Sequence, residues 1–183
     1  MIQPFTHAQE TFPPVLKWQA LAFMRVVWSS IFTGENAYMH ETYPPENSPV
    51  HFGLAHKDCL ISYAAVLTVK IVHQGIPYTV LGFGNMLTFP PYERKGYGTQ
   101  VLRMASEYIQ NSDADLGILF CAHRLESFYS KSGWEVSRGE TYTGPAEDQK
   151  RYDELRMMLY VSEKGRRGRE DFEQFPLSIT WPW

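Results

Sequence analysis

The sequence predicts a mixed α/β fold in which antiparallel strands precede a strand-helix-strand unit. Three runs rich in β-branched and aromatic residues, at 50–55, 59–72 and 76–88, are separated by short turns, which favours an antiparallel meander. Apolar residues then recur at helical spacing over 99–111, and a near-continuous apolar run follows at 116–122. A strand, a helix and a second strand in this order predict a right-handed parallel crossover.

The chain ahead of the meander predicts one amphipathic helix and one irregular segment. Pro13 and Pro14 suit a helix start, and apolar residues from Leu16 to Ile31 mark one face before a stop at Gly34. The segment 35–49 is rich in turn formers and aromatic residues, and its prolines argue against regular structure. It is interpreted either as a loop near a binding site or as plain surface.

The chain after the crossover predicts shorter elements. Residues 123–133 are expected to form a short helix closed by Gly133, and 154–161 a further strand. The segment 163–183 is expected to be a charged, solvated bend followed by a C-terminal edge strand with Trp181 and Trp183 on one face. That aromatic strand either pairs across a homodimer or completes its own sheet.

Composition narrows the classes of partner. The 183 residues, 44% of them hydrophobic, predict a single domain over 1–183, and a formal charge of −3 favours neither nucleic acid nor an anionic membrane. No apolar run approaches membrane-spanning length and the N-terminus has no signal-peptide pattern, so a cytoplasmic location is expected. Cys59 and Cys121 lie in apolar runs and are predicted to be buried free thiols. No histidine spacing predicts a metal site.

The segment Phe89 to Thr99 is the strongest functional signal, because it joins a strand to a helix through a glycine-containing loop. Gly96 and Gly98 allow close approach of a ligand, and the first amides of a helix have no partner within it. Arg94 and Lys95 add positive charge. The loop therefore predicts an anion site of the kind that holds phosphate. Element lengths of about 20 Å for the helix and about 23 Å for the strand place 123–133 beside this loop.

Two separated motifs resemble those of the GNAT superfamily of acyl-CoA-dependent N-acetyltransferases. The first is Thr88-Phe89-Pro90 followed by Glu93-Arg94-Lys95-Gly96-Tyr97-Gly98. These residues occupy the positions of the family patterns V-x-P and [QR]-x-x-G-x-[GA]. The second is Phe128-Tyr129 followed by Gly133-Trp134. The resemblance implies a mostly antiparallel sheet with one splayed parallel strand pair, flanked by helices.

The resemblance also implies acetyl-CoA as cosubstrate, with no metal. The loop amides from Arg94 to Thr99, including Lys95, Gly96, Tyr97 and Gly98, would hold the pyrophosphate, and Thr99 offers a hydroxyl. Met86, Leu87 and Thr88 would pair with the pantetheine arm through their backbone. An N–H near Met86 or Leu87 would stabilise the oxyanion. Gly82 and Gly84 are consistent with a strand distortion that opens the cleft.

Tyr129 is the catalytic residue that the resemblance implies. A phenol with a pKa near 10 is protonated at neutral pH and can donate a proton to the departing thiolate. The family's usual glutamate base would fall at Gly84 or Asn85, neither of which can accept a proton at neutral pH. His123, Glu41 and a water chain remain alternatives for the base.

The implied reaction is transfer of acetyl from acetyl-CoA to a primary amine of a small molecule by direct attack in a ternary complex. The alternatives are acetylation of a protein or peptide, and a non-catalytic acyl-CoA-binding module. Two departures from the family pattern motivate the latter, Glu93 at the start of the phosphate motif and Ala122 where many members have Asn.

The strand I-S-Y-A-A-V-L, the segment R-L-E-S-F-Y-S-K-S-G-W and the tryptophan-ended tail look most like the aminoglycoside 2'-N-acetyltransferase branch. The tail SITWPW, however, carries no acidic side chain. A less charged amine is therefore an equally good candidate acceptor.

Overall fold

The computed structural model describes all of residues 1–183 and divides them into two compact units. Unit 1 comprises Met1–Leu67 and Asn85–Ala105, and unit 2 comprises Thr68–Gly84 and Ser106–Trp183. No helix has both the length and the apolar character needed to cross a membrane.

Unit 1 begins with a strand that the sequence did not predict. β1 (Gln3–Ala8) pairs antiparallel with β2 (Val50–His56), which pairs antiparallel with β3 (Cys59–His73) through the turn at Lys57 and Asp58. β1 is largely exposed, so its sequence lacks the apolar run by which strands are recognised. The predicted strand β2 and its turn to β3 are confirmed.

The first helix is shorter than predicted. α1 spans Pro14–Val27, begins at the two prolines as expected, and buries Leu16, Ala20, Leu21 and Met24. Val27 and Ile31, which were expected on the buried face, are 56% and 52% exposed. The segment 35–49 contains two short 3-10 helices, η2 (Gly34–Tyr38) and η3 (Pro45–Asn47). Short 3-10 turns tolerate proline at their start, which is why the predicted loop still contains local order.

β4 (Ile76–Thr88) runs through both units and ends at the glycine loop. It is followed by η4 (Pro90–Tyr92) in unit 1 and by α2 (Tyr97–Gln110), which starts two residues earlier than predicted and belongs to unit 1 up to Ala105. Cys59, expected to be buried, is exposed because it is the first residue after the β2–β3 turn, whereas Cys121 is buried as predicted. Both thiols are free.

Unit 2 contains the parallel strand pair of the predicted crossover, whose helix α2 is divided between the two units. β4 pairs in parallel with β5 (Leu116–Cys121), and β5 pairs antiparallel with β9 (Leu155–Tyr160). β9 also pairs with the short β6 (Glu135–Val136). Between β5 and β6 lie η5 (His123–Leu125), α3 (Glu126–Tyr129) and η6 (Ser130–Ser132). The short helical segment closed by Gly133 is therefore confirmed, and Gly133 has the left-handed φ of 86° that a helix end requires.

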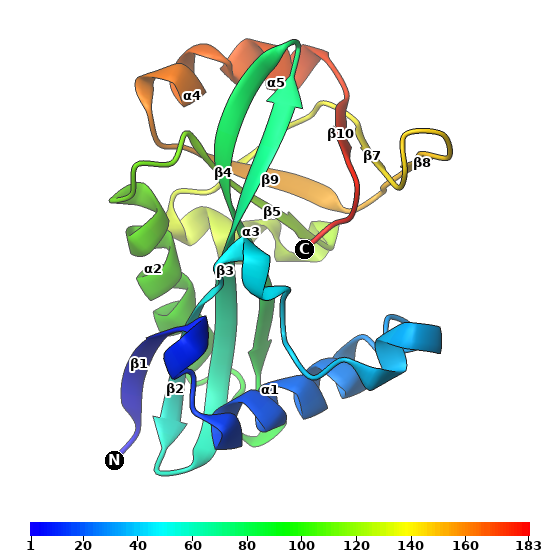
Figure 1. The fold of residues 1–183 in the computed structure, drawn as a ribbon. Helices are drawn as coiled ribbons and strands as arrows, with labels where there is room; N and C mark the ends of the chain where they lie inside the picture. Colours follow the sequence, from blue (N-terminus) through cyan, green and yellow to red (C-terminus); the bar gives the residue numbers. More distant parts are fainter. The chain divides into compact units, whose positions relative to one another are not determined.

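The last part of unit 2 differs from the sequence prediction. The segment expected to be a solvated bend forms two short helices, α4 (Glu163–Arg167) and α5 (Arg169–Gln174). Ser162 caps α4 by accepting from Gly165 N. β10 (Leu177–Ile179) is an edge strand beside β7 (Thr141–Thr143), which pairs with β8 (Lys150–Arg151) (Figure 1). The strand ends before Trp181, so both terminal tryptophans lie outside it.

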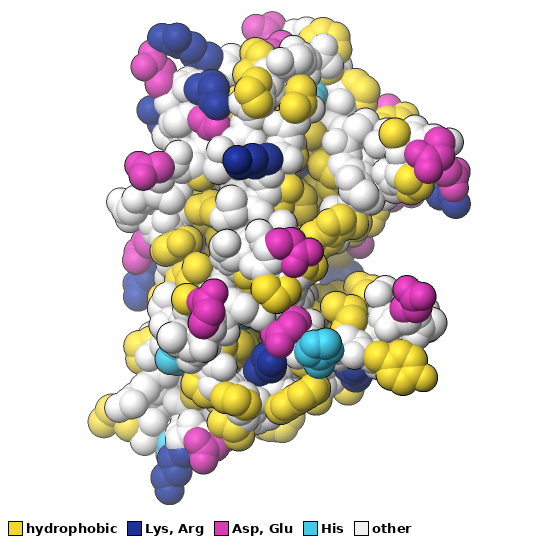
Figure 2. All heavy atoms as spheres, viewed as in Figure 1, with side chains coloured by type: hydrophobic (Ala, Val, Ile, Leu, Met, Phe, Trp, Pro, Cys, Tyr) yellow, Lys and Arg dark blue, Asp and Glu magenta, His cyan; other side chains and the backbone are white.

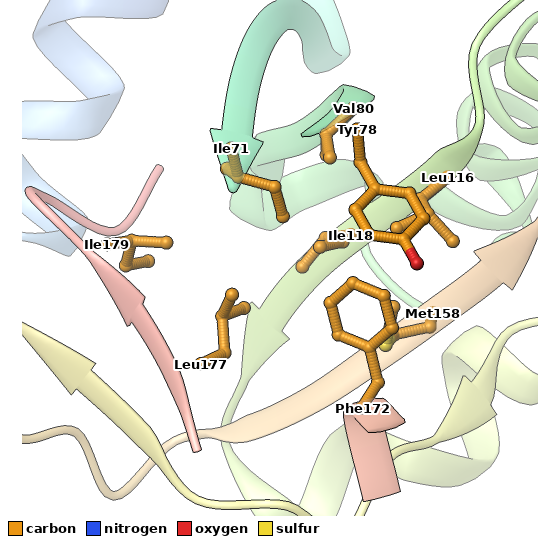
Figure 3. Close-up of a cluster of buried hydrophobic side chains, with 9 residues drawn as sticks. All are labelled: Ile71, Tyr78, Val80, Leu116, Ile118, Met158, Phe172, Leu177 and Ile179. Atoms are coloured by element: carbon orange, nitrogen blue, oxygen red, sulfur yellow. The ribbon is translucent and has the colours of Figure 1, made fainter. Parts of the chain in front are cut away.

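The core of unit 2 lies between the crossover strands and these C-terminal elements. Phe172 of α5 is fully buried and stacks on His73, with ring centroids 4.2 Å apart. Figure 3 shows the surrounding apolar side chains, which are Ile71, Tyr78, Val80, Leu116, Ile118, Met158, Leu177 and Ile179. Burying an apolar face of α5 stabilises a helix too short to be stable alone.

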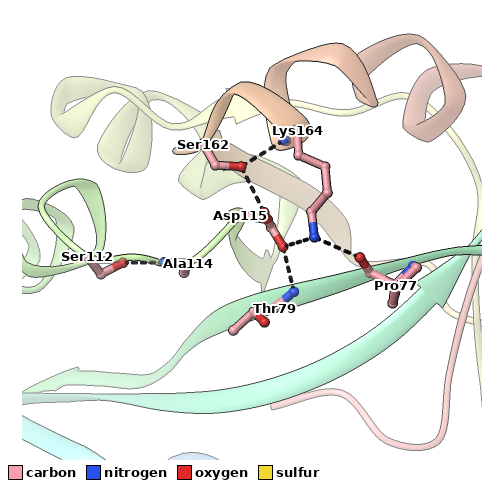
Figure 4. A network of polar contacts seen from close by, with 8 residues as sticks. Pro77, Thr79, Ser112, Ala114, Asp115, Ser162 and Lys164 are labelled. Carbon is pink, nitrogen blue, oxygen red and sulfur yellow. Dashed lines mark hydrogen bonds and ion pairs between the residues drawn. The ribbon is translucent and has the colours of Figure 1, made fainter.

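A network of polar contacts in unit 2 lies at the start of β5. The Asp115 carboxylate accepts from Thr79 N at 2.9 Å and from the Ser162 hydroxyl at 2.8 Å, and pairs with Lys164 at 2.6 Å (Figure 4). Burial opposes ionisation of Asp115, but these donors outweigh it and lower the pKa of the carboxyl. The network fixes α4 to the start of the parallel strand pair.

The mixed, mostly antiparallel sheet with one parallel pair and flanking helices confirms the predicted fold class. Hydrogen-bonded strands follow the order β1-β2-β3-β4-β5-β9-β6. On the face shown in Figure 2, Lys and Arg side chains are interspersed with Asp and Glu, as expected from the small net charge.

Candidate functional site

The predicted anion-binding loop lies in unit 1 between β4 and α2. Arg94 and Gly96 both have left-handed backbone conformations, with φ of 58° and 84°. A Cβ on Gly96 would meet nothing within 4 Å, so glycine is favoured there by its backbone angle and not by lack of space. These two left-handed residues turn the chain from β4 into α2.

The start of α2 presents backbone amides without helical partners. The first helical bond of this turn is donated by Gln100 N to Gly96 O at 3.1 Å, which leaves the amides of Tyr97, Gly98 and Thr99 outside the ladder. Tyr97 and Gly98, predicted as loop residues, are in the first helical turn. Thr99 is exposed.

The basic side chains of this loop are not equivalent. Lys95 folds back, donating from Nζ to the carbonyl oxygen of Pro91 at 2.8 Å with Nζ 5.5 Å from the centre of the Tyr92 ring. Arg94 and Glu93 are both exposed. The exposed charged side chains of the loop outside the Lys95 contact are therefore the Arg94 guanidinium and the Glu93 carboxylate, whose charges partly offset each other.

The predicted pantetheine segment, Met86 to Thr88, is held against β3 within unit 1. The Ser62 hydroxyl donates to the Leu87 carbonyl at 2.9 Å and lies 2.9 Å from the Thr88 hydroxyl. Asn85, just before this segment, has a φ of 55°, which is unusual inside a strand. The strand distortion that was expected at the glycines is therefore at Asn85.

Gly82 has a different role from the one predicted. A Cβ at this position would lie 2.5 Å from Nε1 of Trp183, so the close approach is made by an indole side chain. The same Nε1 donates to the carbonyl oxygen of Ile118 at 2.9 Å. The sequence signal was a glycine inside a strand, but the partner is 101 positions away and only the tertiary structure identifies it.

Tyr129 lies in unit 2 at the end of α3 and is 6% exposed. Its ring meets Phe83 edge to face at 6.0 Å and Phe128 at 5.0 Å. Burial raises the pKa of Tyr129, and the nearby Cys121 thiol acts in the same direction. The hydroxyl therefore carries its proton throughout the physiological range.

Trp134, the last residue of the second motif, is a core residue. It is 1% exposed, donates from Nε1 to the Ser106 hydroxyl at 2.8 Å, and packs on Phe83 at 5.8 Å. Ser106 belongs to α2, so the tryptophan fastens the end of that helix within unit 2. The motif thus combines a structural anchor with a buried, protonated phenol.

The two candidate bases are already engaged in polar contacts. Glu41 in unit 1 pairs with Lys17 at 2.7 Å and accepts from Gln9. His123 in unit 2 is exposed, and its Nε2 lies 3.2 Å from the carbonyl oxygen of Asp153. His123 also lines a surface pocket of about 380 Å³ with Tyr152, Asp153 and Glu154.

A family model described as an acetyltransferase (GNAT) domain matches residues 7–137 of the chain. The chain therefore belongs to the GNAT acetyltransferase family. No curated protein matches it.

Several solved structures share the fold. ElaA of Escherichia coli is similar with a TM-score of 0.62 at 14% identity, over 86% of this chain and 99% of that one. An acyl-CoA N-acyltransferase of Pseudomonas aeruginosa is similar with a TM-score of 0.60 at 12% identity, over the same shares of the two chains. A conserved protein of Enterococcus faecalis matches 75% of this chain at 14% identity and a TM-score of 0.58, but the chain spans 33% of its length.

Proposed function

We propose that this protein transfers the acetyl group of acetyl-CoA to a primary amine of a small molecule. Membership of the GNAT family supports acyl transfer. The observation that carries the proposal is the loop before α2, where the left-handed residues Arg94 and Gly96 precede amides that have no helical partner. This arrangement suits the pyrophosphate of coenzyme A.

In the proposed complex the amides of Tyr97, Gly98 and Thr99 donate to the phosphate oxygens, and Arg94 supplies a cation. Lys95 makes fewer contacts with the phosphates unless its Nζ leaves the carbonyl oxygen of Pro91. The exposed Glu93 lowers the affinity of this loop for phosphate, since like charges repel.

The proposal gives the end of β4 the role of holding the pantetheine arm. Ser62 fixes the Leu87 carbonyl and the Thr88 hydroxyl, so this backbone is rigid before the cosubstrate arrives. An amide of Met86 or Leu87, just after the left-handed Asn85, donates to the thioester oxygen as it becomes an oxyanion.

In the chemical step, the neutral amine attacks the thioester carbon and the carbon–sulfur bond of the tetrahedral intermediate breaks. The departing thiolate takes the proton of the Tyr129 hydroxyl, and the proton lost by the amine nitrogen passes to solvent or to a base. The raised pKa of Tyr129 keeps the acid loaded, and makes its phenolate a short-lived species that is quickly reprotonated.

The test measures release of free coenzyme A thiol from acetyl-CoA by the purified protein with a panel of amines. The panel includes small mono- and diamines, an aminoglycoside and a lysine peptide. A small amine should be consumed fastest. Preference for the peptide would support protein acetylation instead, and preference for the aminoglycoside would support the aminoglycoside 2'-N-acetyltransferase branch.

Two tyrosine variants test the assignment of the acid. Tyr129→Phe should lower kcat about 10²-fold or more while leaving the affinity for acetyl-CoA within about twofold. Tyr38→Phe removes the same hydroxyl from a side chain that is 85% exposed and should change neither value. If acetyl-CoA binds but no amine consumes it, the protein is a non-catalytic binding module and the proposal is wrong.

A further inference from the structure

The first helix of unit 1, α1, exposes apolar side chains along one side (Figure 1). Val15, Trp18 and Val26 are 46%, 54% and 82% exposed, and Ala22 is exposed as well. Spacings of three, four and four residues place these positions within about 80° of the helix circumference, because each residue advances an α-helix by about 100°. We term these residues, Val15, Trp18, Ala22 and Val26, the outer stripe of α1.

The outer stripe lies opposite the face by which α1 packs on unit 1. A surface helix ordinarily turns a charged face to water. In α1 there is no Asp or Glu, and the only charged side chains are Lys17, which pairs with Glu41, and Arg25. The buried face consists of Leu16, Ala20, Leu21 and Met24. A helix that is apolar on both faces is normally covered on both, which indicates that a further surface covers the outer stripe.

The polar side chains that border the outer stripe are bonded to the protein's own backbone. Arg25 on one side donates from Nη2 to the carbonyl oxygens of Ala37 at 2.9 Å and Met39 at 3.1 Å. Gln19 on the other side donates from Nε2 to the carbonyl oxygen of Asp58 at 2.6 Å. Helices that bind anionic membranes present free Lys or Arg side chains beside their apolar face. The outer stripe has no such charge, so the surface that covers it is itself apolar and uncharged.

The order of residues in the outer stripe is complementary to its own reverse. We consider two α1 helices packed antiparallel about a two-fold axis at the level of Ala20. Trp18 of one copy then lies opposite Ala22 of the other, and Val15 lies opposite Val26. The largest side chain of the stripe therefore meets the smallest, and each contact occurs twice, as an isologous interface requires. No like charges are brought together, because the stripe carries none.

We propose that the outer stripe of α1 binds the outer stripe of a second copy of this chain, which makes the protein a two-fold homodimer. The 14 residues of α1 give a helix about 21 Å long, so the interface is at the small end of specific interfaces, near about 1,000 Å² in total. The dimer should dissociate reversibly, with a Kd of roughly 1–100 µM. The interface lies within unit 1 and does not depend on the proposed function.

Sedimentation equilibrium of the full chain between about 1 and 500 µM tests the dimer directly. The wild type should change from monomer to dimer over this range. Val26→Glu should raise the Kd at least about tenfold, because it buries a carboxylate against an apolar partner. Val72→Glu places the same charge on an exposed valine of β3 and should leave the Kd unchanged. A wild type that stays monomeric at the highest concentration would overturn the proposal, even if it bound anionic vesicles or another protein.

Two doubly charged variants test the antiparallel register. One combines Val15→Glu with Val26→Glu, and the other combines Val15→Lys with Val26→Lys. Each variant alone should be monomeric, because the register places like charges opposite each other. An equimolar mixture should form a dimer again, since every carboxylate then lies opposite an ammonium group.

These substitutions replace side chains that are exposed in the single chain, so both variants should keep the circular dichroism spectrum and the urea midpoint of the wild type. Two folded variants that do not associate when mixed would overturn the antiparallel pairing of α1. Dimers that persist in each variant alone would place the interface elsewhere on the molecule, and would overturn the proposal as well.

Discussion

The buried imidazole of His51 shares a hydrogen bond of 2.8 Å with the hydroxyl of Tyr63. Its other nitrogen lies 2.6 Å from Oε1 of Gln9, and the ring stacks on Phe12 at 4.2 Å. Because Gln9 Oε1 can only accept, Nε2 of His51 is the donor in that contact and carries the proton of the neutral ring. This network inside unit 1 fixes the tautomer of a histidine that is shielded from water.

Acid should therefore destabilise unit 1. Burial lowers the pKa of His51 from 6.5 to about 4, with smaller contributions from the charges of His7 and Lys17. Between these two values the unfolded chain binds a proton that the native protein does not, so stability falls as the pH falls from 6.5 to 4. The loss reaches about 3 kcal/mol.

Urea unfolding at several pH values measures this loss for the wild type and for His51→Gln. The variant should be less stable at pH 7, but its stability should change less between pH 6.5 and 4. An equally steep acid dependence in both proteins would show that other groups dominate.

Gly82→Ala should displace the Trp183 indole, since the new methyl carbon would lie 2.5 Å from its Nε1. The expected cost is about 1–3 kcal/mol in the free energy of unfolding. The three atoms nearest to the new methyl all belong to Trp183. In a Trp183→Ala background the same substitution should therefore cost much less, and additive effects in this double-mutant cycle would contradict the contact.

Gly96→Ala should weaken coenzyme A binding by straining the anion loop. Its φ of 84° costs a residue with a Cβ about 1 kcal/mol, although space is available. Gly75→Ala is a matched control, because Gly75 has a φ of 75°, equally open surroundings and a place in the β3–β4 turn. Both variants should lose similar stability, but only Gly96→Ala should raise the Kd for coenzyme A. Parallel changes in Kd would remove the loop from the binding site.

Arg156→Lys should destabilise unit 2 by about 2–4 kcal/mol. The buried guanidinium donates to the Ser137 and Thr141 hydroxyls and to the Glu140 and Phe172 carbonyls. A lysine ammonium has three donors and cannot reach four acceptors arranged as a fork. The exposed Arg138 provides the control, because Arg138→Lys should change the free energy of unfolding by less than about 0.5 kcal/mol. Unfolding midpoints in urea distinguish the two.

The sequence by itself determined the order of the central elements. β2, β3, β4 and β5 were predictable because β-branched and aromatic runs end at turns, and α2 because its apolar residues recur with the helical period. The anion loop and Tyr129 could be singled out because their motifs are local in sequence. Assigning them to one acyl-transfer site remains a prediction of the family resemblance.

The elements and contacts that depend on long-range packing could be assigned only from the tertiary structure. β1 forms by pairing with β2 and not by its own apolar pattern, and α5 is stabilised by burying Phe172 against strands far away in the chain. Glycine is needed at position 82 because the Trp183 indole lies against it, and Phe120 of β5 contacts the rings of Tyr152, before β9, and Trp183, in the tail. Such contacts depend on where the folded chain brings distant residues together, and that information is not present in any local stretch of sequence.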